Sequence, residues 1–195
     1  MARENKFLWL IVLGAIVLGL FMIGSWYVRT RNRLVAMEEG VEAAWSEIDN
    51  QLQRRADLIP NLVNTVRGFA EQEEEIFTRL AEARAQLAGA QGVQETAEGY
   101  GEMQSALSRL LVVVENYPQL RSNENFIRLQ DELAGTENRI AVARRRYNEA
   151  VQQFNTRIRS FPASFIADSL GFEAKEYFEV PESAREVPEV DFSDE

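Results

Sequence analysis

The 195-residue sequence contains no histidine and no cysteine. The missing histidine excludes an imidazole general base, a Ser-His-Asp triad and any histidine-containing zinc or di-iron site. The missing cysteine excludes disulfides, thiolate nucleophiles, iron–sulfur chemistry and a lipoprotein anchor. A glycine-rich phosphate loop is absent as well. We therefore expect a protein that is not an enzyme and that holds neither a metal nor a cofactor.

Positive charge is scarce compared with negative charge. The chain has 21 Lys and Arg against 31 Asp and Glu, which gives a net charge of −10. Phosphate neutralisation needs clustered Lys and Arg, so nucleic acid is not an expected partner. Residues 168–195 carry ten acids and two bases. This composition predicts an acidic, partly disordered tail over residues 168–195.

The longest uncharged run is Phe7 to Val28, FLWLIVLGAIVLGLFMIGSWYV, which follows a short flank of residues 1–6. As a helix it would extend roughly 33 Å, enough to cross a hydrocarbon core of about 30 Å. Trp9 and Trp26 lie near its ends, as expected of side chains at the two membrane interfaces. The run is longer than a signal peptide's apolar region and lacks a small-x-small cleavage site, which predicts a retained single-pass anchor in the lipid bilayer.

Two features of this run concern partners and orientation. Ala15 and Gly19 form a small-x-x-x-small pair, which lets another transmembrane helix approach closely. The pair predicts contact with other membrane proteins or with a second copy of the chain. Two basic residues precede the run within residues 1–6, and three follow it within residues 29–33. This small excess favours a cytoplasmic C-terminal domain and leaves the orientation open.

Beyond the run, apolar residues recur at steps of three and four, the period of amphipathic helices. The stripes predict four helices, over residues 34–59, 61–88, 93–117 and 123–161. Pro60, the Gly89–Gly92 stretch and Pro118 supply the boundaries. Because short connections make successive helices antiparallel neighbours, we expect an all-α fold with an up-and-down four-helix bundle over residues 29–167. The regular heptads of the last helix also fit an intermolecular coiled coil.

The apolar segment from Phe161 to Phe172, FPASFIADSLGF, follows the last predicted helix. In an up-and-down topology this segment returns to the membrane side. It then either enters the bilayer interface, packs on a partner's transmembrane helix, or closes the core of the bundle. The candidate membrane or partner contacts are Phe161, Phe165, Ile166, Leu170 and Phe172.

Charged clusters along the helices are interpreted first as solvated surface. The run from Glu71 to Glu75 could hold a hard cation, but Arg79 lies four residues beyond Glu75 at the spacing of a surface ion pair. The run Arg144, Arg145 and Arg146 is a candidate docking patch for an acidic partner or a lipid headgroup.

Other polar residues are expected to serve the contacts between helices. Within the Arg144–Arg146 run or the Arg54–Arg55 pair, at least one arginine is expected to pair with an acid on a neighbouring helix. Asn148 and Asn155 share a helix face, and the position predicts that they fix helix register.

Three stretches of the chain resemble the LemA family: AWSEIDNQLQRRADLIPNLV (Ala44 to Val63), VENYPQLRSNENFIRLQDELAGTENRIAVARRRYNEAV (Val114 to Val151) and FNTRIRSFPASFIA (Phe154 to Ala167). They occur in this order behind an N-terminal membrane helix. The resemblance implies a bacterial single-span membrane protein with a four-helix bundle, and it brings no catalytic residues. Relatives are linked to membrane-protein quality control and to membrane-compartment formation, which favours scaffold or adaptor roles.

The sequence therefore predicts a helical scaffold or adaptor anchored in the bacterial plasma membrane, which engages other membrane proteins or itself. The alternative is a homo-oligomeric membrane-remodelling protein that inserts its apolar segment at the bilayer interface.

Overall fold

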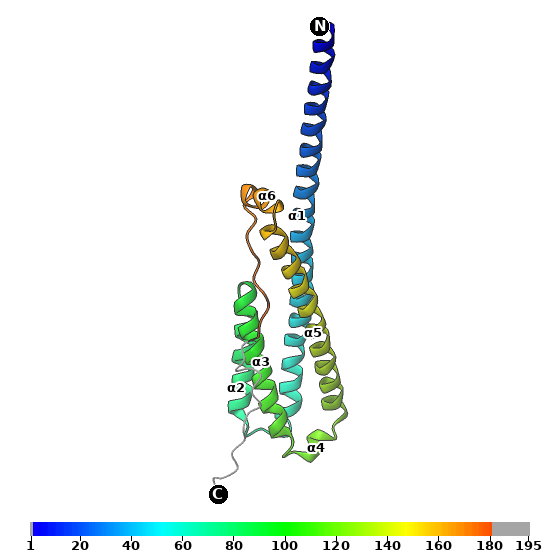
Figure 1. The fold of residues 1–195 in the computed structure, drawn as a ribbon. Coiled ribbons are helices and arrows are strands. Elements are labelled where there is room, and N and C mark those ends of the chain that lie inside the picture. Colours follow the sequence, from blue (N-terminus) through cyan, green and yellow to red (C-terminus); the bar gives the residue numbers. More distant parts are fainter. Residues whose placement is uncertain (1, 181–195) are drawn as a thin grey trace. The chain divides into compact units, whose positions relative to one another are not determined.

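The computed structural model describes residues 2–180, and every regular element among them is a helix (Figure 1). The elements are α1 (Ala2–Arg67), α2 (Glu74–Gly89), α3 (Gly92–Val114), α4 (Pro118–Arg121), α5 (Glu124–Arg159) and α6 (Ala163–Leu170). The all-α prediction is confirmed for this part of the chain. The predicted tail beyond Val180 lies outside the described residues.

The chain separates into two compact units. Unit 1 contains Met1–Glu42 and Ala150–Lys175, and unit 2 contains Ala43–Glu149 and Glu176–Glu195. Each unit has its own buried apolar side chains. Those of unit 1 include Leu34, Val151, Phe154 and Ile158, and those of unit 2 include Ile48, Leu80, Met103 and Phe126.

In unit 2, α1 continues through Pro60, where the sequence predicts a helix boundary. Proline lacks the N–H that would bond to the carbonyl oxygen of Ala56 four residues earlier. In the structure, Arg84 of α2 donates its Nε–H to that oxygen at 3.0 Å. Ile59 and Leu62 are both buried on either side of the proline. The predicted boundary is wrong because a side-chain donor and apolar burial together sustain the helix.

The break falls instead at residues 68–73, which the sequence predicts to be helical. Gly68 weakens the helix there. The hydroxyl of Tyr117 donates to Glu73 Oε1 at 3.0 Å, and Gln72 Nε2 donates to the same hydroxyl oxygen at 2.8 Å. The turn is thus held by a residue distant in sequence, which a local pattern does not reveal.

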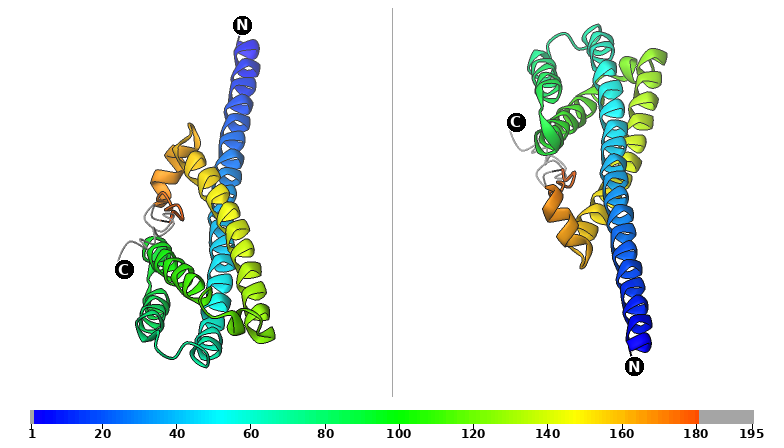
Figure 2. Two further views of the ribbon diagram at one scale, coloured as in Figure 1. Left: turned by 90° about the horizontal axis from the view of Figure 1, so that it is seen from below. Right: turned by 90° about the horizontal axis from the view of Figure 1, so that it is seen from above.

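Helices α2 and α3 lie side by side and are joined by Ala90 and Gln91 (Figures 1 and 2). A Cβ added at Gly99 would lie 3.0 Å from the Cα of Leu87, so glycine permits this close approach. Gly92, at the start of α3, has φ +81°, a conformation that glycine adopts readily.

The last long helix, α5, agrees with its predicted range to within two residues at each end. Its start is capped by Asn123, whose Oδ1 accepts hydrogen bonds from the backbone N–H groups of Asn125 and Phe126. The sequence predicts no helix beyond it, yet α6 forms there. Pro162 and Gly171, the latter with φ +73°, are its N-cap and C-cap residues. Eight residues are too few for periodicity to reveal a helix.

Candidate interaction sites

The apolar run of α1 belongs to unit 1, and its described side chains, from Trp9 onward, are not buried. By length and composition, α1 is the one helix of the described residues that is apolar enough to cross a membrane. The side chains of Trp9 and Phe21 are 73% and 74% exposed. Around Gly19, no heavy atom lies within 4 Å of an added Cβ, and Ala15 is exposed. The small-residue face is therefore open to another helix.

The predicted contacts in the Phe161–Phe172 segment divide into two groups. Phe161, Phe165 and Leu170 are exposed. Ile166 is buried, so it is wrong as a surface contact: its side chain serves the packing of α6 in unit 1. Phe172 is half-buried. Its ring packs edge-on against the ring of Phe154, with 6.1 Å between the two ring centroids.

Unit 1 also holds the first part of an extended C-terminal segment. Asn155 accepts a hydrogen bond from the backbone N–H of Lys175 at 2.9 Å and donates to its carbonyl at 2.8 Å. The ammonium of Lys175 pairs with Glu38 of α1 at 2.7 Å. Asn155 thus binds a backbone rather than another helix.

In unit 2 a second asparagine binds the backbone of the same segment, and aromatic rings surround the residue that it binds. Asn148 accepts from the N–H of Phe178 at 2.9 Å and donates to its carbonyl at 3.2 Å. Phe178 is buried, and the centroid of its ring lies 6.0 Å from that of Trp45 and 6.2 Å from that of Tyr100. The hydroxyl of Tyr147 donates to the Glu176 carbonyl at 2.9 Å. The prediction that Asn148 and Asn155 fix helix register overlooked this extended segment, because nothing in the helical pattern indicates its course.

Burial changes the ionisation of Tyr147. It raises the pKa of the phenol to about 12, and the negative charge of Glu176 acts in the same direction. The neutral hydroxyl, which donates the hydrogen bond, is therefore the form that the folded chain favours.

The inside of unit 2 contains a polar cluster centred on Arg55, which is buried. Its guanidinium forms an ion pair with Glu137 of α5 and donates to Gln104 Oε1 of α3 at 2.7 Å. The hydroxyl of Tyr100 donates to the same Glu137 carboxylate and lies 2.7 Å from both Oε1 and Oε2. Burial, followed by this carboxylate, raises the pKa of Tyr100. The pairing confirms the expectation that an arginine binds an acid on a neighbouring helix.

The candidate docking patch Arg144–Arg146 lies on α5 in unit 2. Arg145 and Arg146 are exposed, while Arg144 is half-buried, and its charge partly opposes the increase in the pKa of Tyr100. The three side chains therefore differ in surroundings, as expected for consecutive helical residues, and the docking role stays a prediction.

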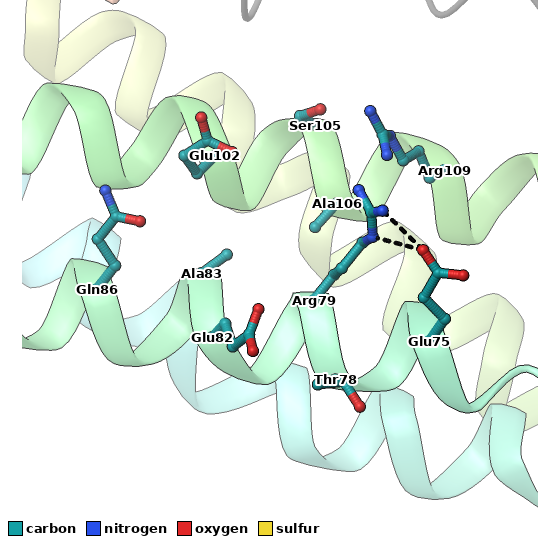
Figure 3. Close-up of a pocket in the computed structure, with 10 residues that line it drawn as sticks. All are labelled: Glu75, Thr78, Arg79, Glu82, Ala83, Gln86, Glu102, Ser105, Ala106 and Arg109. Atoms are coloured by element: carbon teal, nitrogen blue, oxygen red, sulfur yellow. Dashed lines mark hydrogen bonds and ion pairs between the residues drawn. The ribbon is translucent and has the colours of Figure 1, made fainter.

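A groove of about 590 Å³ lies between α2 and α3 (Figure 3). It is lined by charges of both signs, including Glu82, Glu102 and Arg109. Arg79 donates to Glu75 Oε1 at 2.7 Å, which confirms the predicted i, i+4 ion pair. Mixed charges on a solvated wall do not select one kind of ligand.

Over residues 2–180, these features define an all-helical protein in which one helix has an exposed segment that is apolar enough to cross a membrane, and whose internal polar residues link its helices. Residues 44–192 match the sequence profile of the LemA family, and the chain belongs to that family.

The chain is similar to two groups of known proteins. Magnetosome proteins MamQ 1 and MamQ 2 of Paramagnetospirillum magneticum (strain AMB-1) are 28% identical to it, over 76% of this chain and 64% of theirs. Protein LemA of Metamycoplasma hominis is 24% identical, over 82% of this chain and 73% of its own. The chain thus spans less than two thirds of the length of the MamQ proteins.

Proposed function

We propose that the chain is a membrane-anchored helical scaffold or adaptor, without catalytic activity, that acts at the bacterial plasma membrane. The observation that carries this proposal is the apolar run of α1, in which none of the described side chains is buried by the chain itself. A surface this long and apolar requires lipid or another protein's helix around it. The small excess of basic residues after the run supports a cytoplasmic C-terminal domain.

A scaffold needs a folded body beside its anchor, and we infer that this body is an up-and-down four-helix bundle. In unit 2, Arg55 joins α1 to α3 through Gln104 and to α5 through Glu137. Helix α2 packs on α3 through the close approach at Gly99. These contacts are those expected where four helices share one core.

The surface that we assign to a membrane-protein partner or a second copy is the Ala15 and Gly19 face of α1. Small residues permit the backbone contact that stabilises helix pairs in lipid. This face is open in the structure.

Crosslinking in intact membranes tests the assignment. The chain lacks cysteine, so Ala15→Cys introduces one reactive thiol on the small-residue face, and Val17→Cys is a control about half a turn away. A bismaleimide reagent followed by mass spectrometry identifies the linked proteins. We expect defined adducts from the first variant and few from the second. Equal or absent labelling, together with monomers on detergent extraction, would contradict a partner on this face.

A second candidate function is homo-oligomeric membrane remodelling. It is favoured by the exposure of Phe161 and Phe165, which leaves two large apolar side chains free to enter a bilayer. Reconstitution of the full chain into liposomes tests it by electron microscopy. Tubulated vesicles with large homo-oligomers would support remodelling, and unchanged vesicles with monomeric protein would exclude it.

A further inference from the structure

Helix α6 has one buried face, and its Phe165 forms an exposed aromatic edge together with Phe161, which lies two residues before the helix. Ala163, Ile166 and Ala167 are buried. Phe161 and Phe165 are 79% and 70% exposed. Their rings pack edge-on, with 5.9 Å between the ring centroids. This exposure equals that of side chains in the apolar run of α1. Two adjacent phenylalanines in water are unfavourable, which indicates that an apolar phase covers them.

The position of α6 along α1 suggests which phase this is. Both belong to unit 1. Along α1, the first buried side chain after the apolar run is Thr30, followed by Leu34. All views show α6 beside the blue part of α1, next to the apolar run (Figures 1 and 2). The exposed arginines of residues 29–33 flank Thr30, and such residues lie at the lipid headgroups when a helix spans a bilayer.

We propose that α6 is an interfacial membrane helix, whose Phe161 and Phe165 edge enters the headgroup region of the bilayer that α1 crosses. The inference rests on the membrane anchoring proposed above. Lipid is the occupant because α6 lies near the end of the apolar run (Figures 1 and 2), where the bilayer surface meets α1 if that run spans a membrane. The exposed carboxylate of Asp168 sets the depth, since it stays among the headgroups while aromatic rings are favourable just below them.

Single cysteines with nitroxide labels measure this depth in the full chain. Ser169→Cys places a label on the exposed side of α6, about 40° around the helix from Phe165, and leaves both phenylalanines intact. Ile16→Cys reports on the apolar run, and Gln152→Cys is a control at an exposed position of α5 in unit 1. The chain is placed one copy per nanodisc, in phosphatidylcholine with phosphatidylglycerol. We expect an aqueous nickel reagent to reach the label at residue 169 about tenfold less often than the label at residue 152.

Each outcome separates the inference from the anchor on which it rests. Equal accessibility at residues 169 and 152, with residue 16 protected, would overturn the interfacial helix and leave the anchor intact. An accessible residue 16 would overturn the anchor as well. If residue 169 is protected in crowded vesicles but not at one copy per disc, a second copy covers the surface and the lipid assignment is wrong.

A second variant tests the rings themselves. Phe161→Ser with Phe165→Ser, in the Ser169→Cys chain, leaves the buried face of α6 unchanged. We expect the nickel accessibility at residue 169 to rise to that of residue 152, while circular dichroism shows unchanged helix content. Continued protection would contradict insertion of the rings.

Discussion

Arg84→Met removes the side-chain donor that bonds to the Ala56 carbonyl oxygen beside Pro60. A hydrogen bond that involves a charged group contributes about 1.5–3 kcal/mol, and an unpaired buried acceptor costs a similar amount. Ala56 is half-buried, so water can replace part of the bond. We therefore expect the substitution to lower the free energy of unfolding by about 1–2 kcal/mol.

By the same reasoning, the loss of stability caused by Arg84→Met depends on which residue stands at position 60. In Pro60→Ala the new backbone N–H can bond to the Ala56 oxygen within the helix, so Arg84 is no longer needed there. Arg84→Met should then cost only about 0.5 kcal/mol, and the two substitutions should show a coupling of about 1 kcal/mol in a double-mutant cycle.

Denaturant unfolding of the four chains in detergent, followed by circular dichroism, measures this cycle. Arg79→Met is the matched control on α2, because its ion pair with Glu75 is exposed and should contribute less than about 1 kcal/mol. Equal costs of Arg84→Met with proline and with alanine at position 60 would refute the idea that Arg84 replaces the missing proline donor.

Three further predictions follow from the contacts of unit 2 and from one glycine of unit 1. Because the folded chain raises the pKa of Tyr147 above its unfolded value of about 10, the contribution of this residue to stability should be complete below about pH 10 and be lost between about pH 10 and 12. Thermal melts over this range should show a smaller fall in Tyr147→Phe. Asn148→Ala removes two hydrogen bonds to Phe178, so the Phe178 amide should lose hydrogen-exchange protection, whereas the exposed control Gln152→Ala should not change it. Gly99→Ala should destabilise by about 1–3 kcal/mol because its Cβ meets the Leu87 backbone, while Gly40→Ala, with open space around it, should stabilise by about 0.5–1 kcal/mol in the same unfolding assay.

The sequence predicts helices best where the apolar stripe is long and the caps are local. Helix α5 satisfies both conditions, with Asn123 at its start. The prediction fails around Pro60, where the helix depends on Arg84, which lies 28 positions from the carbonyl that it binds. It also fails at α6, which is too short to show a period.

Side chains that bind backbone groups far away in the sequence are equally difficult to predict. The spacing of Asn148 and Asn155 places them on one helix face, but each binds one residue of an extended segment that carries no helical period. The sequence predicts that an arginine such as Arg55 pairs with an acid, because a buried arginine needs one. It does not identify Glu137 as that partner. Sequence spacing specifies a face of a helix, and only the tertiary fold specifies what lies against it.

The distribution of polar groups explains why the proposed function lies on the surface. In unit 2, Arg55, Tyr100 and Glu137 bind one another, so their charges and hydroxyl stabilise helix contacts instead of facing a substrate. A partly buried ion pair of this kind adds little net stability compared with apolar packing, but its hydrogen bonds favour one relative position of the helices. Such a body presents its surfaces in a fixed arrangement, which suits a protein that organises partners. The large apolar side chains with the highest exposure among the described residues, Phe161, Phe21 and Trp9, lie in unit 1, and it is there that the proposed function places lipid and partner proteins.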